Sequence, residues 1–153
     1  MPHINEKIDF TVEVFIVFKN RVLLRKHDKF KKWLSVGGHI ELNEDPIEAA
    51  HREVKEEVGL DIELVGNKKI FESTDHSREL LPPMAINRHP ISGTHEHVSF
   101  VYFGRATTDT IQPTYADDIS EECRWCTKED LEKIDLWPNV KAYALAALER
   151  LGE

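Results

Sequence analysis

The sequence predicts an α/β fold, in which strands and helices alternate along one chain. Three observations lead to this prediction. Apolar runs rich in β-branched residues recur between polar turns, and two other segments carry apolar residues at helical spacing. The chain of 153 residues is also long enough to bury one core but short for two domains. We therefore expect residues 1–153 to form a single domain.

The first strands of the predicted sheet lie close together in the sequence. Residues 10–18 (FTVEVFIVF) are rich in β-branched and aromatic side chains, which is typical of a strand. A two-residue polar turn separates them from residues 21–24, so these two strands should form a hairpin. Residues 33–36 predict a further short strand that ends at Gly37 and Gly38.

A helix is predicted directly after this strand, because both of its ends carry capping signals. Asp45 stands at the N-cap, Pro46 fits the first helical position, and Glu48 completes a capping box. Gly59 provides the C-terminal stop. Between these positions lies an apolar stripe made of Ile47, Ala50, Val54 and Val58. The helix should therefore be amphipathic and pack on the sheet.

The second half of the chain alternates in the same way. Residues 61–65 and 68–71 are predicted as short strands, and residues 73–94 as a long polar connection that contains three prolines. A connection of that length in a compact domain is usually a functional loop, so we expect it to fold over the functional site and influence which ligand is preferred. The remaining expected elements are strands at 98–103 and 124–126, a helical turn at 128–133 and a helix at 139–151.

Composition excludes several classes of protein. Asp and Glu outnumber Lys and Arg by 28 to 20, and a net charge of −8 disfavours long nucleic acid as a partner. No apolar run approaches the roughly 20 residues that cross a bilayer, and the N-terminus lacks an apolar signal core. These features predict a cytoplasmic protein without a membrane segment.

The two cysteines, Cys123 and Cys126, do not suggest a disulfide-rich secreted domain. We interpret them as small buried residues of a strand. The alternative is a Cys₂His₂ zinc site completed by His95 and His97, which would share one face of a strand.

Three glutamates on the predicted helix carry the main functional signal. Glu53, Glu56 and Glu57 are spaced i, i+3 and i+4, so their carboxylates project from one face. Like charges at this spacing repel one another, and a divalent cation held among them would remove that repulsion. Carboxylate oxygens select Mg²⁺, or Mn²⁺ as a substitute, over softer metals.

These glutamates belong to a segment, residues 38–60, that resembles the Nudix box. The family signature is G-x₅-E-x₇-R-E-U-x-E-E-x-G-U, where U is an aliphatic residue, and every fixed position matches. The matching residues are Gly38, Glu44, Arg52, Glu53, Val54, Glu56, Glu57, Gly59 and Leu60.

The resemblance implies an α/β/α sandwich with a mixed β-sheet and hydrolysis of a diphosphate linkage in a nucleoside diphosphate-x substrate. That substrate could be a nucleoside triphosphate, a nucleotide sugar or a compound of the ADP-ribose type. Water would be activated by a Glu-bound divalent cation. The residues implied as catalytic are Glu53, Glu56 and Glu57, which would also bind the metal together with the carbonyl of Gly37. Supporting roles fall to Gly38, Glu41, Glu44 and Arg52.

Residues outside the box are less strongly indicated. Nudix enzymes often recruit one more acid, and we favour Glu122 as a further metal ligand, with Asp118 second and Glu96 as another candidate. Candidate substrate-binding residues are Arg25, Trp33, Arg78 and Arg88, because they are basic or can stack on a base. His39 and His51 are interpreted as structural or exposed.

Two other functions within the family remain as alternatives. A Nudix-fold isopentenyl diphosphate isomerase would need a catalytic cysteine near the metal, and the cysteines here lie far beyond the box. A non-catalytic ligand-sensing Nudix domain would commonly lack box glutamates, whereas this box is complete. The oligomeric state cannot be read from the sequence, although homodimers are frequent in the family.

Overall fold

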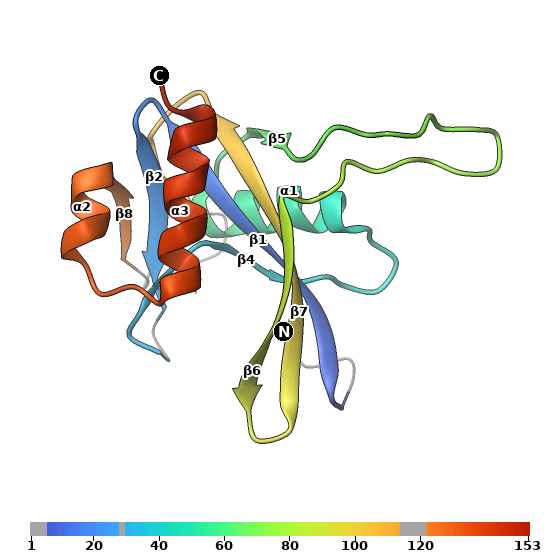
Figure 1. Ribbon diagram of the computed structural model, residues 1–153, viewed down its shortest axis with the longest axis horizontal. Helices are drawn as coiled ribbons and strands as arrows, with labels where there is room; N and C mark the ends of the chain where they lie inside the picture. The colour runs from blue at the N-terminus through green and yellow to red at the C-terminus, as the bar shows by residue number, and fades with distance from the viewer. Residues whose placement is uncertain (1–5, 28–29, 114–121) are drawn as a thin grey trace.

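Eight strands join into one mixed β-sheet among the described residues of the computed structural model, which are 6–27, 30–113 and 122–153 (Figure 1). The long central strands β1 (Ile8–Phe18) and β7 (His95–Ala106) run parallel to each other. The other strands are β2 (Arg21–Lys26), β3 (Trp33–Leu34), β4 (Val36–His39), β5 (Ile62–Val65), β6 (Ala85–Ser92) and β8 (Cys123–Cys126). The order is β3-β2-β1-β7-β5, with β4 on β1, β6 on β7 and β8 on β2.

Helices cover both faces of this sheet. Helix α1 (Pro46–Val58) packs on one face, while α2 (Lys128–Lys133) and α3 (Pro138–Leu151) lie on the other. Figure 1 shows α3 in front of the sheet and α1 behind it. Each face has its own buried apolar cluster, and β1 contributes to both because successive strand residues point in opposite directions. The predicted α/β/α sandwich with a mixed sheet is confirmed.

The capping signals of α1 operate as predicted. The Glu48 amide donates to Asp45 Oδ1 at 2.9 Å, and the Asp45 amide donates to Glu48 Oε1 at 3.0 Å. Gly59 ends the helix with a φ of 70°, a left-handed conformation in which glycine has no steric penalty. The caps hold both ends of the helix that carries the box glutamates.

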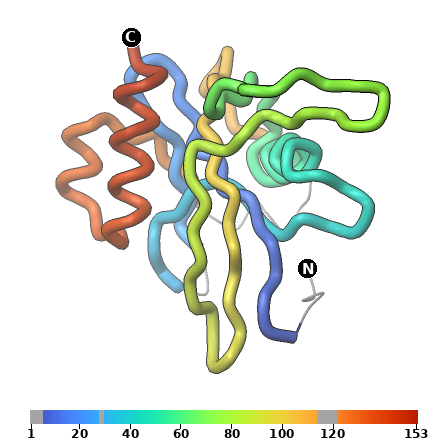
Figure 2. The backbone as a smooth tube through the Cα atoms, turned by 45° about the vertical axis from the view of Figure 1, so that its right-hand side comes forward, coloured from blue at the N-terminus to red at the C-terminus, as the bar shows by residue number. Residues whose placement is uncertain are grey.

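The predicted strand at residues 68–71 is wrong. The chain leaves the sheet after β5, and the Asn67 amide and side chain donate to the carbonyls of Pro82 and Pro83 at 3.0 and 2.9 Å. Beyond this point the segment projects from the domain (Figures 1 and 2), so Ile70 and Phe71 stay 86% and 72% exposed. Apolar residues alone do not make a strand when the segment leaves the sheet and pairs with none of its described strands.

The predicted connection at residues 73–94 is also wrong in its second half. Ala85–Ser92 form β6, an antiparallel partner of β7, and β7 itself begins at His95 rather than at residue 98. The polar composition and Pro90 hide this strand in the sequence. Both are tolerated because β6 pairs on one side only among the described residues, as outer strands with proline do. The described helices include none long and apolar enough to span a membrane.

Candidate active site

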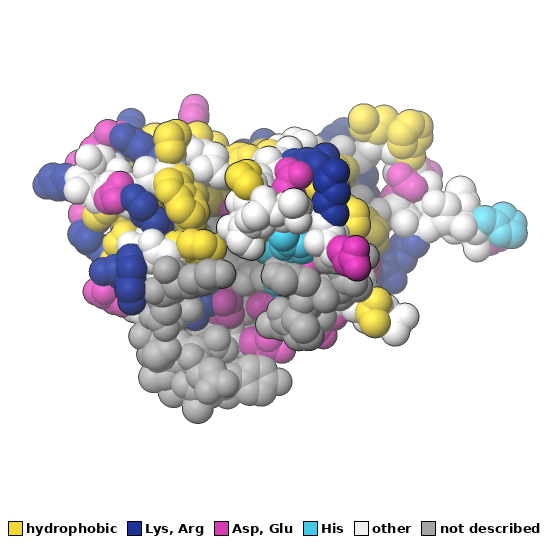
Figure 3. Space-filling model, turned by 90° about the horizontal axis from the view of Figure 1, so that it is seen from below, with side chains coloured by type: hydrophobic (Ala, Val, Ile, Leu, Met, Phe, Trp, Pro, Cys, Tyr) yellow, Lys and Arg dark blue, Asp and Glu magenta, His cyan; other side chains and the backbone are white. Residues whose placement is uncertain are grey.

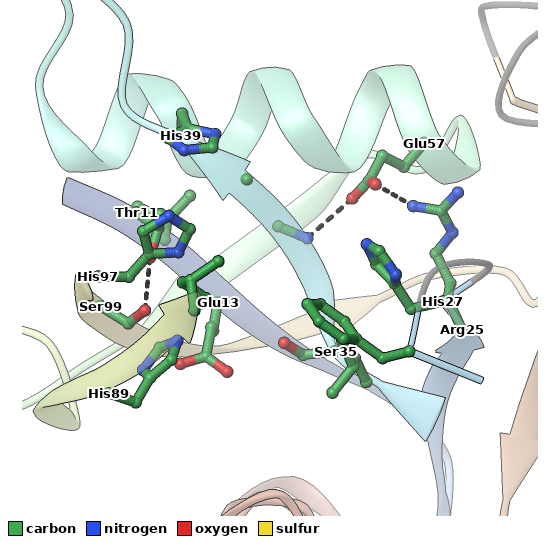
Figure 4. Close-up of a pocket in the computed structure, with 16 residues that line it drawn as sticks. Thr11, Glu13, Arg25, His27, Ser35, His39, Glu57, His89, His97 and Ser99 are labelled. Carbon is green, nitrogen blue, oxygen red and sulfur yellow. Dashed lines mark hydrogen bonds and ion pairs between the residues drawn. The ribbon is translucent and has the colours of Figure 1, made fainter. Parts of the chain in front are cut away.

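A cleft of about 350 Å³ opens between the sheet and the C-terminal part of α1 (Figure 4). Glu57 of α1 lies at one end, beside Gly37 and Gly38 of β4. His89 and His97, from β6 and β7, lie at the other end. Strand β4 therefore runs along the cleft, from the end beside Glu57 to the end lined by histidines.

Glu57 is held from two sides. Arg25 of β2 forms an ion pair with its carboxylate, and the Gly37 amide donates to Glu57 Oε1 at 2.8 Å. The Glu57 side chain is only 16% exposed. Burial raises the pKa of Glu57 to about 8, an effect that outweighs the opposing charge of Arg25.

Glu53 lies directly against the glycine pair. A Cβ atom at Gly38 would come within 2.5 Å of Glu53 Oε1, so only glycine leaves room for this carboxylate. Burial also raises the pKa of Glu53 to about 7, although Arg52 acts in the opposite direction. Burial therefore disfavours the ionised form of both of these neighbouring carboxylates.

Arg52 connects the box glutamates with the loop before the helix. Its guanidinium donates to both carboxylate oxygens of Glu44 and to the carbonyl of His39 at 2.9 Å. It also donates to Glu53 at 2.9 Å and to Glu56 at 3.3 Å. These hydrogen bonds lower the pKa of Glu44 and raise that of Arg52. The arginine therefore holds the loop and the helix together through charge-assisted bonds.

This arrangement fits a hard divalent cation. Glu53 and Glu57 present carboxylates whose pKa values burial raises although Arg52 and Arg25 lie beside them. The glycine pair leaves backbone exposed beside them, where a Cβ would close the space. Oxygen ligands with this charge suit Mg²⁺ or Mn²⁺.

Other predicted site residues are spread more widely. Arg25 lines the cleft, and Glu41 lies 3.7 Å from Arg52. Trp33 packs against the apolar cluster beneath α3 and is not among the residues that line the cleft. Glu122 is exposed, and its carbonyl accepts from the Lys26 amide at 2.8 Å. Asp118 lies outside the described residues.

The two remaining arginines lie at the surface. Arg78 belongs to the projecting segment, is 77% exposed and lies 3.6 Å from Asp45. Arg88 of β6 is half exposed and donates two hydrogen bonds to Glu96, at 2.7 and 2.8 Å. Neither arginine lines the cleft.

Sequence reasoning missed one acid in the cleft, Glu13 of β1. It stands opposite Gly37 in the sheet, and burial raises its pKa although Asn87 lies within hydrogen-bonding distance. The available signal was a lone glutamate inside an otherwise apolar strand, FTVEVFIVF. Its pairing with Gly37 depends on β1–β4 register, which sequence composition does not reveal.

The cysteines lie apart from this chemistry. Both belong to β8, where Cys126 is buried and Cys123 half-buried, and neither forms a disulfide. Cys126 pairs in register with Val22, which pairs with Val17 and through it with Arg105 near the C-terminal end of β7. His95 and His97 lie at the N-terminal end of β7. The Cys₂His₂ zinc alternative is therefore wrong, and neither cysteine lines the cleft as an isomerase would need.

The fold and the site together define an α/β/α sandwich with an acidic, arginine-braced helix beside the glycine pair of β4. A family model described as "NUDIX domain" matches residues 9–148 of this chain. The chain belongs to the NUDIX family. It is a pyrophosphohydrolase of that family, whose members hydrolyse nucleoside diphosphate derivatives.

Solved structures share this fold. A hydrolase of the NUDIX family from Clostridium perfringens is 36% identical, with a TM-score of 0.80 over 94% of this chain and 97% of its own. A MutT NUDIX hydrolase from Burkholderia pseudomallei is 22% identical, with a TM-score of 0.64 over 95% and 99%. The E. coli ORF135 protein is 17% identical, with a TM-score of 0.61 over 92% and 90%. A comparison with curated proteins found no match.

Proposed function

We propose that this chain cleaves the diphosphate linkage of a small nucleoside diphosphate-x substrate with the help of Mg²⁺ or Mn²⁺. The observation that supports this proposal most strongly is the joint burial of Glu53 and Glu57 beside Gly37 and Gly38, at one end of the cleft. Candidate substrates are nucleoside triphosphates, nucleotide sugars and compounds of the ADP-ribose type.

Glu53, Glu56 and Glu57 would hold the cation, with the carbonyl of Gly37 as a backbone ligand. When bound, the cation neutralises charge on the diphosphate and lowers the pKa of an attacking water. Exposed Glu122 stays a prediction as a further ligand. Glu13 is a second candidate, because it lines the cleft and pairs in register with Gly37.

The chain's own residues would position the reacting groups. Arg52 fixes the loop before α1 through Glu44 and the His39 carbonyl, so the carboxylates keep their spacing. Arg25 lines the cleft and balances the charge of Glu57, which keeps that carboxylate in place. Hydrolysis at phosphorus needs mainly positioning and charge stabilisation, which this arrangement supplies.

A substrate panel tests this proposal. Canonical and oxidised nucleoside triphosphates, nucleotide sugars, ADP-ribose and dinucleoside polyphosphates are incubated with the purified protein and Mg²⁺, and the products are identified. We expect diphosphate cleavage of at least one class, and loss of that cleavage in excess EDTA while the circular dichroism spectrum stays unchanged. Full turnover in EDTA would contradict the proposed metal requirement.

A matched pair of variants on one helix locates the site. Glu56→Gln removes a carboxylate of the cation-binding face, so we expect kcat to fall on the order of 10²-fold or more. Glu48→Gln is the control, because Glu48 is exposed and glutamine also completes a capping box. Equal kcat values for the two variants would place the chemistry elsewhere.

Three further expectations accompany this function. The net charge of −8 favours a small substrate over long nucleic acid. A cytoplasmic location stays a prediction that cell fractionation would test. A homodimer likewise stays a prediction, for which light scattering during gel filtration is the direct measurement.

A further inference from the structure

A second cluster of ligating side chains lies where β1, β4 and β7 meet, at the histidine-lined end of the cleft. Asp9 of β1 pairs in register with His97 of β7, and His95 lies two residues earlier on the same strand. Ligand atoms of these three residues all lie within 4.8 Å of one another. Figure 3, which views the molecule from below, shows histidine side chains at the surface near the middle of this face.

His39 joins the same cluster from the end of β4. Its Nε2 lies 3.6 Å from Asp9 Oδ2, and its ring centroid lies 4.9 Å from that of His97. Figure 4 shows the rings of His39 and His97 close to each other in the cleft. Three strands therefore bring three imidazoles to one buried carboxylate, Asp9, which is only 2% exposed.

Two donor-atom distances in this cluster are close to those between ligands on one tetrahedral metal ion, and the ligand atoms of Asp9, His95 and His97 all lie within 4.8 Å of one another. Metal bonds of about 2.0–2.1 Å at tetrahedral angles place neighbouring donor atoms roughly 3.3 Å apart. The Nε2 atoms of His95 and His39 lie 3.2 and 3.6 Å from Asp9 Oδ2. A carboxylate and imidazoles at these separations form a nitrogen-rich ligand set, unlike the all-oxygen box.

The hydrogen bonding of His95 supports the same conclusion. Its Nδ1 lies 3.0 Å from the backbone carbonyl of Glu6, which can only accept, so Nδ1 carries the proton. In the neutral ring, Nε2 then presents a lone pair toward Asp9. A backbone carbonyl on the second ring nitrogen is the usual way in which a metal-binding histidine is oriented.

Charge provides a further argument. Asp9 is a buried carboxylate that lies within ion-pair distance of two imidazoles. One divalent cation bound by neutral imidazoles would balance the Asp9 charge at the centre of this cluster. We propose that Asp9, His39, His95 and His97 bind a first-row transition metal ion such as Zn²⁺, separately from the cation of the box glutamates.

The proposed site would join three strands that are distant in the sequence. His39 follows directly on the glycine pair, and His97 lines the cleft. Metal binding would therefore tie the start of β1 to β7 and rigidify the wall beside the substrate. The site does not depend on the hydrolytic activity, so it can be tested whether or not the substrate is known.

A cobalt titration tests the site directly. Co²⁺ in tetrahedral nitrogen and oxygen coordination absorbs visible light much more strongly than Co²⁺ in a six-coordinate oxygen site. The titration is performed in excess Mg²⁺ on the full chain carrying Glu56→Gln, which weakens the box site. We expect one Co²⁺ per chain with a tetrahedral spectrum that Zn²⁺ displaces.

Matched variants assign the ligands. His97→Gln should lower the affinity for Co²⁺ at least about 100-fold. His89→Gln is the control, because His89 also lines the cleft but its Nδ1 contacts Asn87 Oδ1 at 2.7 Å. Binding that survives His97→Gln, or that His89→Gln removes equally, would overturn the proposal.

A measurement on the wild-type protein avoids any folding defect of a variant. Histidine-ring ¹H–¹⁵N spectra should show that Zn²⁺ shifts the signals of His39, His95 and His97 and leaves that of exposed His76 unchanged. Mg²⁺ should shift none of the three. The absence of a Zn²⁺ effect on all three rings would overturn the proposal.

Discussion

Arg52 donates two hydrogen bonds to Glu44, from Nε to Oε2 at 3.0 Å and from Nη2 to Oε1 at 2.6 Å. The planar guanidinium of arginine matches a carboxylate in this two-point geometry, whereas an ammonium group does not. The same side chain also donates from Nη1 to both Glu53 and Glu56. One residue thus organises the loop before α1 and the acidic face of the helix.

Arg52→Lys should therefore destabilise the protein although it conserves charge. We expect a loss of about 2 kcal/mol in the free energy of unfolding, because lysine cannot replace the charge-assisted bonds to Glu44 and the His39 carbonyl. Urea titration measures this change in the free energy of unfolding. Arg105→Lys, in an exposed pair with Glu63, serves as control and should change stability by no more than about 0.5 kcal/mol. Equal losses of stability in Arg52→Lys and Arg105→Lys would contradict this structural role of Arg52.

The two glycines of β4 should respond differently to alanine. At Gly37 a Cβ would lie 2.0 Å from the backbone carbonyl oxygen of Val12, so Gly37→Ala should cost about 1–3 kcal/mol of stability. At Gly38 the obstacle is the end of the Glu53 side chain, which can move. Gly38→Ala should keep the melting temperature but lower kcat about 10–100-fold by displacing that carboxylate. Thermal unfolding and steady-state kinetics are measured for both variants. A lower melting temperature for Gly38→Ala with no change for Gly37→Ala would contradict this prediction.

His89 and Arg88 are neighbours on β6 that point to opposite sides of the strand. Because His89 lines the cleft while Arg88 pairs with Glu96, His89→Ala should raise KM several-fold and Arg88→Ala should change it little. The sequence-based prediction was that Arg88 and Arg78 bind the substrate. Measuring KM for several diphosphate substrates in His89→Ala, Arg88→Ala and Arg78→Ala decides between the two accounts, and a larger effect of Arg88→Ala or Arg78→Ala than of His89→Ala would restore that prediction.

The Cys126 thiol should resist alkylation in the folded protein. Burial raises its pKa from 9.0 to about 11, so the reactive thiolate is scarce at pH 8.5. The stability that this neutral thiol contributes is present below the unfolded-state pKa and is lost as pH rises through the folded-state value. Mass spectrometry after iodoacetamide treatment of a Cys123→Ser variant measures the modification. Rapid labelling at pH 8.5 without urea would contradict the prediction.

The sequence alone determined the fold class, the boundaries of α1 and the Nudix box. These features are local: caps, helical spacing and a fixed motif act over a few turns, and α1 begins at Pro46 and ends at Val58 as its signals predict. The failures, at residues 68–71 and 85–92, concern strands, whose existence depends on a partner edge rather than on their own composition.

Only the tertiary structure decided which distant residues meet. Strand register places Glu13 opposite Gly37 and Asp9 opposite His97. The approach of β2 to α1 pairs Arg25 with Glu57. These residues are separated by tens of positions in the chain, and no local rule relates them, because the free energy that brings them together comes from burying the two apolar faces of the sheet.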